Sequence, residues 1–297
     1  MAHRIHIEPI GQSIDVAEGQ TVLDACLRAG VWLPHACCHG LCATCKVQVL
    51  EGDIDHGEAS NFALMDFERD EGKILACCAT AQSDIVIEAD IEEEPDAQYL
   101  PLEDFVGVVE RTAALTPTIR GIWLRPDKPM RFQAGQYVLV QVPGVAGPRA
   151  FSIASAPGDA LVELHVRKVE GGAATGWLHD KLKVGDRLDF SGPFGRFFVR
   201  KSANLKALFV AGGSGLSSPQ AMVVDLLAEG AGHPVVLFHG ARNRAELYHA
   251  ELFMSLTERH PNFSYVPVLS GGDDPDWIAA TRHGDAQLKA YGAGELP

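Results

Sequence analysis

The sequence lacks several features that would assign it to common functional classes. Its 297 residues contain no run of eighteen apolar residues, so we expect no membrane span and no membrane partner. The first residues have no apolar stretch of the kind found in signal peptides, so we expect a cytoplasmic protein. Internal repeats and low-complexity tracts are also missing. These absences predict an ordinary globular chain.

Basic residues are scarce in the first third of the chain. Residues 1–98 contain 19 acidic and 5 basic side chains, so the whole formal net charge of −14 lies there. Such a region disfavours nucleic acid as a partner. Its acidity either serves solubility or forms a docking face for a basic redox partner, because opposite potentials speed encounter.

The patterns of apolar residues divide the chain into three predicted domains. Residues 1–92 alternate as strands around one short helix, which predicts an α+β domain of the β-grasp type. An acidic linker over 93–103 follows. Strands separated by Gly and Pro turns predict an antiparallel β-barrel over 104–202. Strand–helix alternation predicts an α/β domain with a parallel sheet over 203–297.

The last domain has the clearest element pattern. We expect strands at 207–211, 235–238 and 263–269, and helices at 219–229 and 245–259. Three strands are few for such a lobe, and no clear strand follows them. We therefore expect the lobe to be incomplete at its C-terminus.

Four of the seven cysteines lie between positions 37 and 45. Cys37, Cys42 and Cys45 have the spacing C-x4-C-x2-C, and Cys77 follows after 31 intervening residues. This spacing is typical of a plant-type 2Fe–2S cluster, in which a tight loop supplies three thiolates and a distant segment the fourth. Spacing alone does not decide between Cys77 and Cys78 as the fourth ligand.

Two other metal centres are less compatible with this pattern. The pair Cys42 and Cys45 alone would permit zinc, but zinc ribbons usually combine two such knuckles and only one is present. A Rieske centre needs two histidine ligands. His35 and His39 lie nearby, but four thiolates already suffice for a cluster.

A flavin motif lies at the end of a predicted barrel strand. Arg149, Ala150, Phe151 and Ser152 fit the pattern R-x-[Y/F]-S. We expect Arg149 to neutralise the flavin pyrophosphate, Phe151 to pack on the flavin and Ser152 to hydrogen-bond its ring near N5. Alternatively, Phe151 is an ordinary residue of the hydrophobic core.

Glycine-rich segments on both sides support the flavin hypothesis. Gly172 and Thr175 lie where a helix begins, and the backbone N–H groups of a helix N-terminus can hold a phosphate. The segments 132–137 and 192–195 complete the barrel pattern. Together these features predict bound FAD.

A second Gly-rich turn follows the first buried strand of the last domain and opens a helix. Gly212, Gly213 and Gly215 would let the backbone approach a pyrophosphate. Gly240 and Arg242 end the next strand, where an adenosine ribose would lie. Arg242 could equally be a solvated surface charge. The turn predicts a nicotinamide dinucleotide as electron donor.

Together these motifs resemble the reductase components of bacterial multicomponent oxygenases, above all those of phenol hydroxylases, within the ferredoxin–NADP reductase superfamily. The resemblance implies that Cys77 is the fourth ligand and that FAD and NADH are used. It also implies electron delivery to a diiron hydroxylase that oxidises phenols. No catalytic side chain is expected, because the cofactors carry the chemistry. The resemblance is carried by the segments 39–47, 58–60, 75–78, 149–152, 171–176, 211–216 and 240–248.

Departures from the family pattern leave other functions open. Such reductases continue with further strands and a Cys-Gly-Pro-Pro-Met-type segment, which is missing here. The oxygenase partner could instead be a Rieske ring-hydroxylating dioxygenase or another aromatic or alkane monooxygenase. A non-enzymatic electron carrier with a non-functional NADH lobe is the third hypothesis.

Overall fold

The computed structural model describes residues 2–91 and 94–270, which divide into two compact units. The first unit contains residues 1–103 together with Pro193–Arg196, and the second contains the rest of the chain. The predicted incompleteness of the last domain concerns residues beyond 270 and so lies outside the described residues. Among the described helices, none is long and apolar enough to cross a membrane.

A five-stranded mixed sheet forms the first unit, in the order β2-β1-β7-β3-β5. Strands β1 and β7 run parallel, and the other pairs in the sheet are antiparallel. The elements are β1 (His3–Glu8), β2 (Gln12–Val16), α1 (Val22–Arg28), β3 (Lys46–Glu51), β4 (Ile54–Asp55), α2 (Asp66–Asp70), β5 (Lys73–Leu75), β6 (Thr80–Ala81) and β7 (Ile85–Glu88). This is the predicted α+β fold.

Local sequence explains the edges of this sheet and its helix. Ile5 and Ile7 are fully buried, while His6 between them is partly exposed, as strand periodicity requires. Helix α1 begins after Thr21, whose hydroxyl accepts a hydrogen bond from the N–H of Asp24 (3.3 Å). Asp24 also pairs with Arg28 one turn later (2.9 Å).

The end of the expected acidic linker belongs to the first unit. Leu102 is buried, and its N–H donates to the carbonyl of Leu27 (3.1 Å). The indole N–H of Trp32 donates to the carbonyl of Leu100 (3.1 Å). The chain is therefore tied to the α+β unit up to the start of the barrel.

The second unit begins with a six-stranded antiparallel barrel in the order β11-β10-β13-β8-β9-β12. An antiparallel bridge between Ile153, next to β11, and Leu164 of β12 joins the two ends of this order, so the sheet nearly closes on itself. The elements are β8 (Glu103–Ala114), β9 (Ile119–Pro126), β10 (Tyr137–Val140), β11 (Arg149–Ser152), β12 (Val162–Arg167), α3 (Ala173–Asp180) and β13 (Arg187–Phe194).

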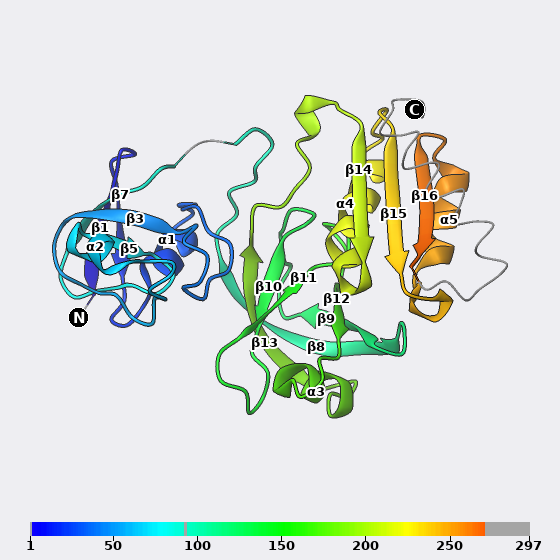
Figure 1. Ribbon diagram of the computed structural model, residues 1–297, viewed down its shortest axis with the longest axis horizontal. Coiled ribbons are helices and arrows are strands. Elements are labelled where there is room, and N and C mark those ends of the chain that lie inside the picture. Colours follow the sequence, from blue (N-terminus) through cyan, green and yellow to red (C-terminus); the bar gives the residue numbers. More distant parts are fainter. Residues whose placement is uncertain (1, 92–93, 271–297) are drawn as a thin grey trace. The chain divides into compact units, whose positions relative to one another are not determined.

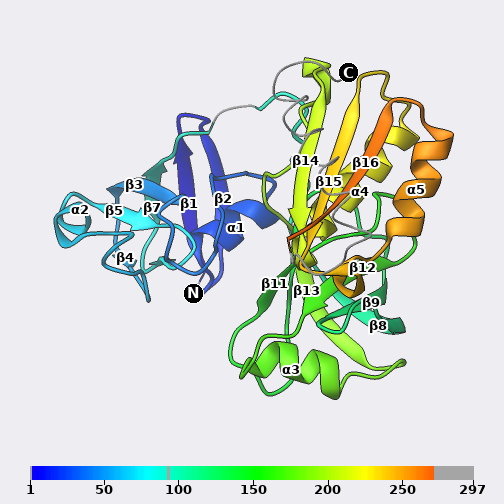
Figure 2. The ribbon, with the colours of Figure 1, turned by 45° about the vertical axis from the view of Figure 1, so that its right-hand side comes forward.

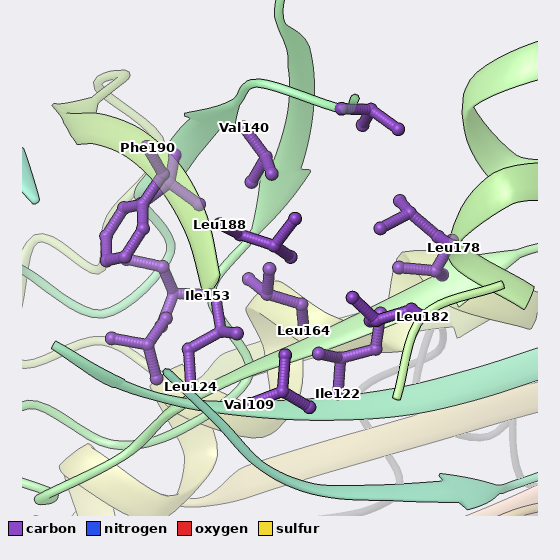
Figure 3. Close-up of a cluster of buried hydrophobic side chains, with 14 of the residues drawn as sticks. Val109, Ile122, Leu124, Val140, Ile153, Leu164, Leu178, Leu182, Leu188 and Phe190 are labelled. Carbon is purple, nitrogen blue, oxygen red and sulfur yellow. The ribbon is translucent and has the colours of Figure 1, made fainter. Parts of the chain in front are cut away.

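Buried apolar side chains from most strands of the barrel fill its interior. Figure 3 labels Val109, Ile122, Leu164 and Leu188 among them. Helix α3 adds Leu178 to this core and covers one end of the barrel (Figure 1). The barrel is thus a packed scaffold that holds its loops and helix in place.

A three-stranded parallel sheet completes the second unit, in the order β14-β15-β16. Figure 2 shows the strands side by side, with α4 and α5 packed beside them. Both helices share one apolar cluster with the sheet, as expected for strand–helix–strand crossovers. The elements are β14 (Ala207–Gly212), α4 (Ser217–Ala228), β15 (Val235–Ala241), α5 (Ala250–Arg259) and β16 (Phe263–Leu269).

One predicted helix is wrong in its first part. The pattern indicated a helix over 245–259, but α5 begins only at Ala250. A single 3₁₀ turn (Arg244–Glu246) comes first, and His249 then takes a left-handed conformation with φ of 56°. The hydroxyl of Tyr248 hydrogen-bonds outside the helix, which accounts for the interruption.

Candidate cofactor sites

The four predicted cysteine ligands come together in the first unit. Cys37 and Cys42 interact through hydrogen bonds, as do the thiols of Cys45 and Cys77. Cys42 also acts electrostatically on Cys45. Three of these residues lie on the loop before β3, and Cys77 follows β5, which pairs with β3. The sheet register therefore brings the distant fourth cysteine to the loop.

The loop between the cysteines has an unusual backbone. Cys38, Gly40 and Ala43 all have positive φ, between 56° and 72°. This region costs energy for residues other than glycine, and such strain concentrates at functional sites. The loop is fixed to the rest of the unit because Gly40 accepts a hydrogen bond from the N–H of Ser60 (3.0 Å).

Cys77 and Cys78 differ in their surroundings. The thiol of Cys77 hydrogen-bonds to Cys45, one of the loop cysteines. The sulfur of Cys78 lies against the backbone of Gly40, only 2.7 Å from where a Cβ at that position would be. The Cys78 sulfur also lies 3.7 Å from that of Cys77 and interacts electrostatically with Cys45 and Cys37, so both cysteines border the loop thiols and the choice of Cys77 stays a prediction.

The pKa values of the thiols reflect their crowding. Hydrogen bonding to Cys77, together with burial, raises the pKa of Cys45. Burial would raise the pKa of Cys42 as well, but hydrogen bonds from Thr44 and Cys37 outweigh it and lower the value to about 7. Four sulfurs held this close repel one another as thiolates unless a cation lies between them. The donor set therefore fits a thiolate-held 2Fe–2S cluster.

The predicted flavin motif occupies strand β11. Arg149 is exposed, and its Nη1 donates to the carbonyls of Ala146, Gly147 and Pro148 (3.0–3.1 Å). Phe151 is half-buried and packs against the barrel core. Ser152 is half-buried at the end of the strand. The motif thus presents a cation, a ring and a hydroxyl along one edge of the barrel.

The N-terminus of α3 carries the other predicted flavin residues. Gly172 is the N-cap, and a Cβ there would approach the Thr175 hydroxyl to 2.8 Å, so glycine is required. The Thr175 hydroxyl accepts the N–H of Val169 (3.1 Å) and closes the turn. Helix α3 follows β12, which is bridged to the end of β11. The flavin motif and the N-terminus of α3 therefore belong to adjacent parts of the barrel. This arrangement fits a flavin diphosphate at the helix N-terminus.

The Gly-rich turn of the last domain links β14 to α4. Gly212 ends β14 opposite Gly240 of β15, and a Cβ on Gly212 would be 3.1 Å from the Gly240 carbonyl. Gly213 has φ of 55° and starts a 3₁₀ turn (Gly213–Leu216). Gly215 is exposed with open space around it. The turn leaves backbone exposed at the carboxyl end of the sheet, where dinucleotides bind.

A cavity of about 310 Å³ lies beside this turn. It brings together three predicted residues, Gly213, Gly240 and Arg242, whereas Gly212 and Gly215 are not part of its lining. Its walls also include Ala241 and Glu246, from the segment 240–248 that carried the resemblance, and residues that the sequence did not point to: Thr118, Ile119, Arg167, Val268 and Ser270.

Two polar groups of the cavity come from distant parts of the chain. Arg167 ends barrel strand β12, and Glu246 lies in the 3₁₀ turn after β15. The Thr118 hydroxyl donates to Glu246 (3.0 Å), and Arg242 lies 3.8 Å from the same carboxylate. The cavity therefore offers a cation for a pyrophosphate and a carboxylate for a ribose hydroxyl, which fits a nicotinamide dinucleotide.

A buried polar cluster next to the turn was also missed. Glu163 and His165 of β12 contact His249, and Tyr248 links His165 to the Gly213 carbonyl. Burial lowers the pKa of His165. Burial would raise the pKa of Glu163, but its contacts with His165 and His249 outweigh it and lower the value to about 2. The Glu163 carboxylate is therefore ionised beside the buried ring of His165.

Comparison with known proteins assigns the same three parts to cofactor-binding families. Residues 5–82 match the 2Fe-2S iron-sulfur cluster binding domain. Residues 121–199 match the oxidoreductase FAD-binding domain, and residues 209–292 the oxidoreductase NAD-binding domain. The chain is 56% identical to the phenol 2-monooxygenase reductase component DmpP of Pseudomonas sp. strain CF600, over 100% of this chain and 88% of the relative.

The chain belongs to the family of monooxygenase reductase components. The predicted fold, resemblance and cofactor set (2Fe–2S, FAD and NAD) are confirmed. A more distant relative is the propane 2-monooxygenase reductase component of Rhodococcus jostii RHA1, 34% identical over 94% of this chain and 76% of its own.

Solved structures of related reductases share the fold. The Amycolatopsis cytochrome P450 reductase GcoB is 37% identical, with a TM-score of 0.85 over 92% of this chain and 83% of its own. The ferredoxin reductase of carbazole 1,9a-dioxygenase is 26% identical, with a TM-score of 0.76 over 93% of this chain and 82% of its own. This chain is therefore an oxidoreductase built like reductases that serve several kinds of oxygenase.

Proposed function

We propose that this reductase passes electrons from NADH through FAD and a 2Fe–2S cluster to a diiron phenol hydroxylase. The observation that carries the proposal is the convergence of four thiols in a chain that also has a barrel flavin motif and a dinucleotide cavity. Full-length identity of 56% to a phenol 2-monooxygenase reductase component supports this choice of oxygenase. We also propose a cytoplasmic location, where cysteines stay reduced.

Each cofactor would be held by groups of a different kind. Cys37, Cys42, Cys45 and Cys77 would ligate the cluster. When bound, the flavin converts a two-electron hydride donor into a source of single electrons. The β11 segment Arg149–Ser152 and the N-terminus of α3 would bind and orient the flavin.

The cavity beside the Gly-rich turn would bind NADH. The turn at Gly213 and the facing Gly240 let the dinucleotide backbone approach the sheet closely. Arg167 would neutralise the pyrophosphate from the barrel side. Glu246 would accept a hydrogen bond from a ribose hydroxyl and would repel an added phosphate, which favours NADH over NADPH.

Docking of the oxygenase would use the acidic first unit. Helix α2 carries Asp66 and Asp70 on its exposed surface. Phe62, Met65 and Phe67 are exposed on and next to the same helix. Acidic groups that surround exposed apolar side chains are suited to steering a basic partner and then holding it.

Anaerobic titration of the purified protein with NADH tests the electron path. We expect flavin absorbance to bleach and cluster absorbance to fall, with iron and FAD both present. A preparation that contains zinc without iron, or no flavin, would contradict the proposal. Absence of bleaching by NADH would instead support the non-enzymatic carrier.

A matched pair of variants tests the proposed dinucleotide cavity. Removing the charge in Arg167→Gln should raise KM for NADH about tenfold, which corresponds to about 1.4 kcal/mol. Lys168→Gln removes the neighbouring charge, which pairs with Asp180 outside the cavity (2.7 Å), and should leave KM unchanged. Equal effects of both changes would show that Arg167 acts only through general charge.

Reconstitution with different oxygenases tests the proposed partner. We expect turnover with a diiron phenol hydroxylase and little with a Rieske dioxygenase at equal reductase concentration. Preferential turnover of the Rieske enzyme would transfer the proposal to ring-hydroxylating dioxygenases.

A further inference from the structure

A buried group of metal-ligating side chains lies between the barrel and the nucleotide-binding sheet. Glu163 Oε1 is 3.0 Å from His165 Nε2 and 3.3 Å from His249 Nε2. The three ligand atoms all lie within 4.8 Å of one another. The side chains of His165 and Glu163 are 0% and 11% exposed, so water barely reaches them. None of these residues belongs to the proposed cluster, flavin or NADH sites.

Tyr248 holds the ring of His165 in place. Its hydroxyl donates to the carbonyl of Gly213 (3.0 Å) and lies 3.1 Å from Nδ1 of His165. Nε2, the other ring nitrogen, lies 3.0 Å from Glu163 Oε1. An Nδ1–H that donates to the Tyr248 oxygen leaves the lone pair of Nε2 facing this carboxylate.

In this arrangement a cation between Nε2 and Glu163 Oε1 satisfies both atoms. An imidazole that donates its second N–H to a fixed oxygen is also the usual arrangement of a histidine that binds metal. Tyr248 supplies that oxygen here. The contact between Glu163 and His165 thus has the orientation of a ligand pair.

His249 and Gln220 border the same group. Nε2 of His249 is buried and lies 3.3 Å from Glu163 Oε1, without the alignment of a hydrogen bond. Nε2 of Gln220 lies 3.4 Å from the other Glu163 oxygen. His249 has a left-handed backbone (φ 56°), a conformation that concentrates at functional positions.

We propose that Glu163, His165 and His249 bind a divalent transition metal of the Zn²⁺ class. Zn²⁺ binds histidine nitrogens and carboxylate oxygens at ~2.0–2.2 Å, and tetrahedral geometry then separates neighbouring ligand atoms by ~3.3 Å. The two contacts of Glu163, 3.0 and 3.3 Å, are close to this spacing, and the two histidine nitrogens lie within 4.8 Å of each other. The ion joins β12 of the barrel to the start of α5 and, through Tyr248, holds the turn at Gly213 in place.

Metal analysis of the purified full-length holoprotein tests the proposal. The protein is incubated with ZnCl₂, desalted and analysed for zinc, iron and FAD. We expect about one zinc per chain in addition to the cluster iron, and an unfolding temperature raised by about 4 °C or more relative to chelator-treated protein. Absence of both effects would overturn the proposal and assign the cation between Glu163 and His165 to a proton.

Matched variants locate the bound zinc. His249→Asn keeps a residue that tolerates the left-handed backbone, and it should lose the zinc while it retains iron and FAD. His260→Asn, a control in the same lobe, should retain all three. Zinc retention by both variants would place the ion elsewhere and overturn the proposal. If His249→Asn fails to fold, Glu163→Gln is measured in its place by the same criteria.

Discussion

The cysteine loop and the Gly-rich turn prepare for cofactors in opposite ways. In the loop, the backbone has positive φ at Cys38 and Ala43, between the predicted ligands, and hydrogen bonds within the first unit hold it. In the turn, only Gly213 has a positive φ, and the chain there offers no charged side chain. Its position depends on Gly240 and Tyr248, which lie far along the sequence. The conformation of a loop that supplies ligands can thus be specified by its own sequence. The position of a phosphate-binding turn depends on residues from other parts of the chain.

The largest expected effect is loss of the cluster held by the cysteine loop when a predicted ligand is replaced. Cys77→Ser should abolish cluster absorbance and electron delivery to the oxygenase, because a serine hydroxyl is a poor substitute for a thiolate ligand of iron. NADH-dependent reduction of ferricyanide, which can draw on the flavin alone, should persist. Cys78→Ser is the matched control and should keep its iron. Loss of iron in that control, with iron retained in Cys77→Ser, would reverse the assignment of the fourth ligand.

The difference between the two regions also explains what could be predicted from the sequence. The spacing of Cys37, Cys42 and Cys45 encodes the loop directly, and the strand–turn–helix pattern located Gly213. The cavity residue Arg167 was missed because it joins the turn only through tertiary packing.

The alternation of polar and apolar residues along β12 did not reveal that its polar side chains are buried. Glu163, His165 and Arg167 alternate with apolar residues, which is typical of a strand with one face in water. The structure buries Glu163 and His165 instead, against α4 and the residues before α5. Period-two patterning gives the face of a strand but not what covers it. The helix start at 245 was wrong for a related reason, since only the fold shows the bonds of Tyr248.

The next largest expected effect is a loss of folding stability at acid pH through His239 of the nucleotide-binding sheet. Burial lowers the pKa of His239 to about 4 from 6.5, and nearby His249 adds to this. Above pH 6.5 the ring is neutral in both folded and unfolded chains. Between pH 6.5 and 4 the unfolded chain binds a proton that the folded chain does not, so about 3 kcal/mol of stability is lost.

Denaturant unfolding followed across that pH range measures the effect. His239→Asn removes the titration and should flatten the dependence, although it gives up the hydrogen bond to Tyr265 (3.1 Å). His260→Asn should leave the dependence in place. A slope unchanged in His239→Asn would assign the acid sensitivity to other groups.

A smaller effect compares glycines in the two regions directly. At Gly40 an added Cβ meets the Cys78 sulfur at 2.7 Å, whereas at Gly213 the nearest atom, on Arg167, is 3.8 Å away. Both glycines have positive φ. Gly40→Ala should therefore cost about 2 kcal/mol or more and loosen the cluster, and Gly213→Ala about 1 kcal/mol. Thermal unfolding measures both stability losses, and KM for NADH is measured alongside. Equal stability losses in the two variants would contradict the prediction.

The smallest expected effect concerns charge, since the excess of −14 lies within residues 1–98 and residues 99–297 are balanced. If the acidic unit docks the oxygenase, association should slow several-fold as salt rises from ~0.01 to ~1 M, because the screening length shortens from ~30 to ~3 Å. Asp66→Asn with Asp70→Asn on α2 should reduce both the rate and its salt dependence. Glu251→Gln with Glu258→Gln removes two exposed charges from α5 and should change neither. Rates indifferent to salt, or equal effects of the two pairs, would reduce the acidity of the first unit to a contribution to solubility.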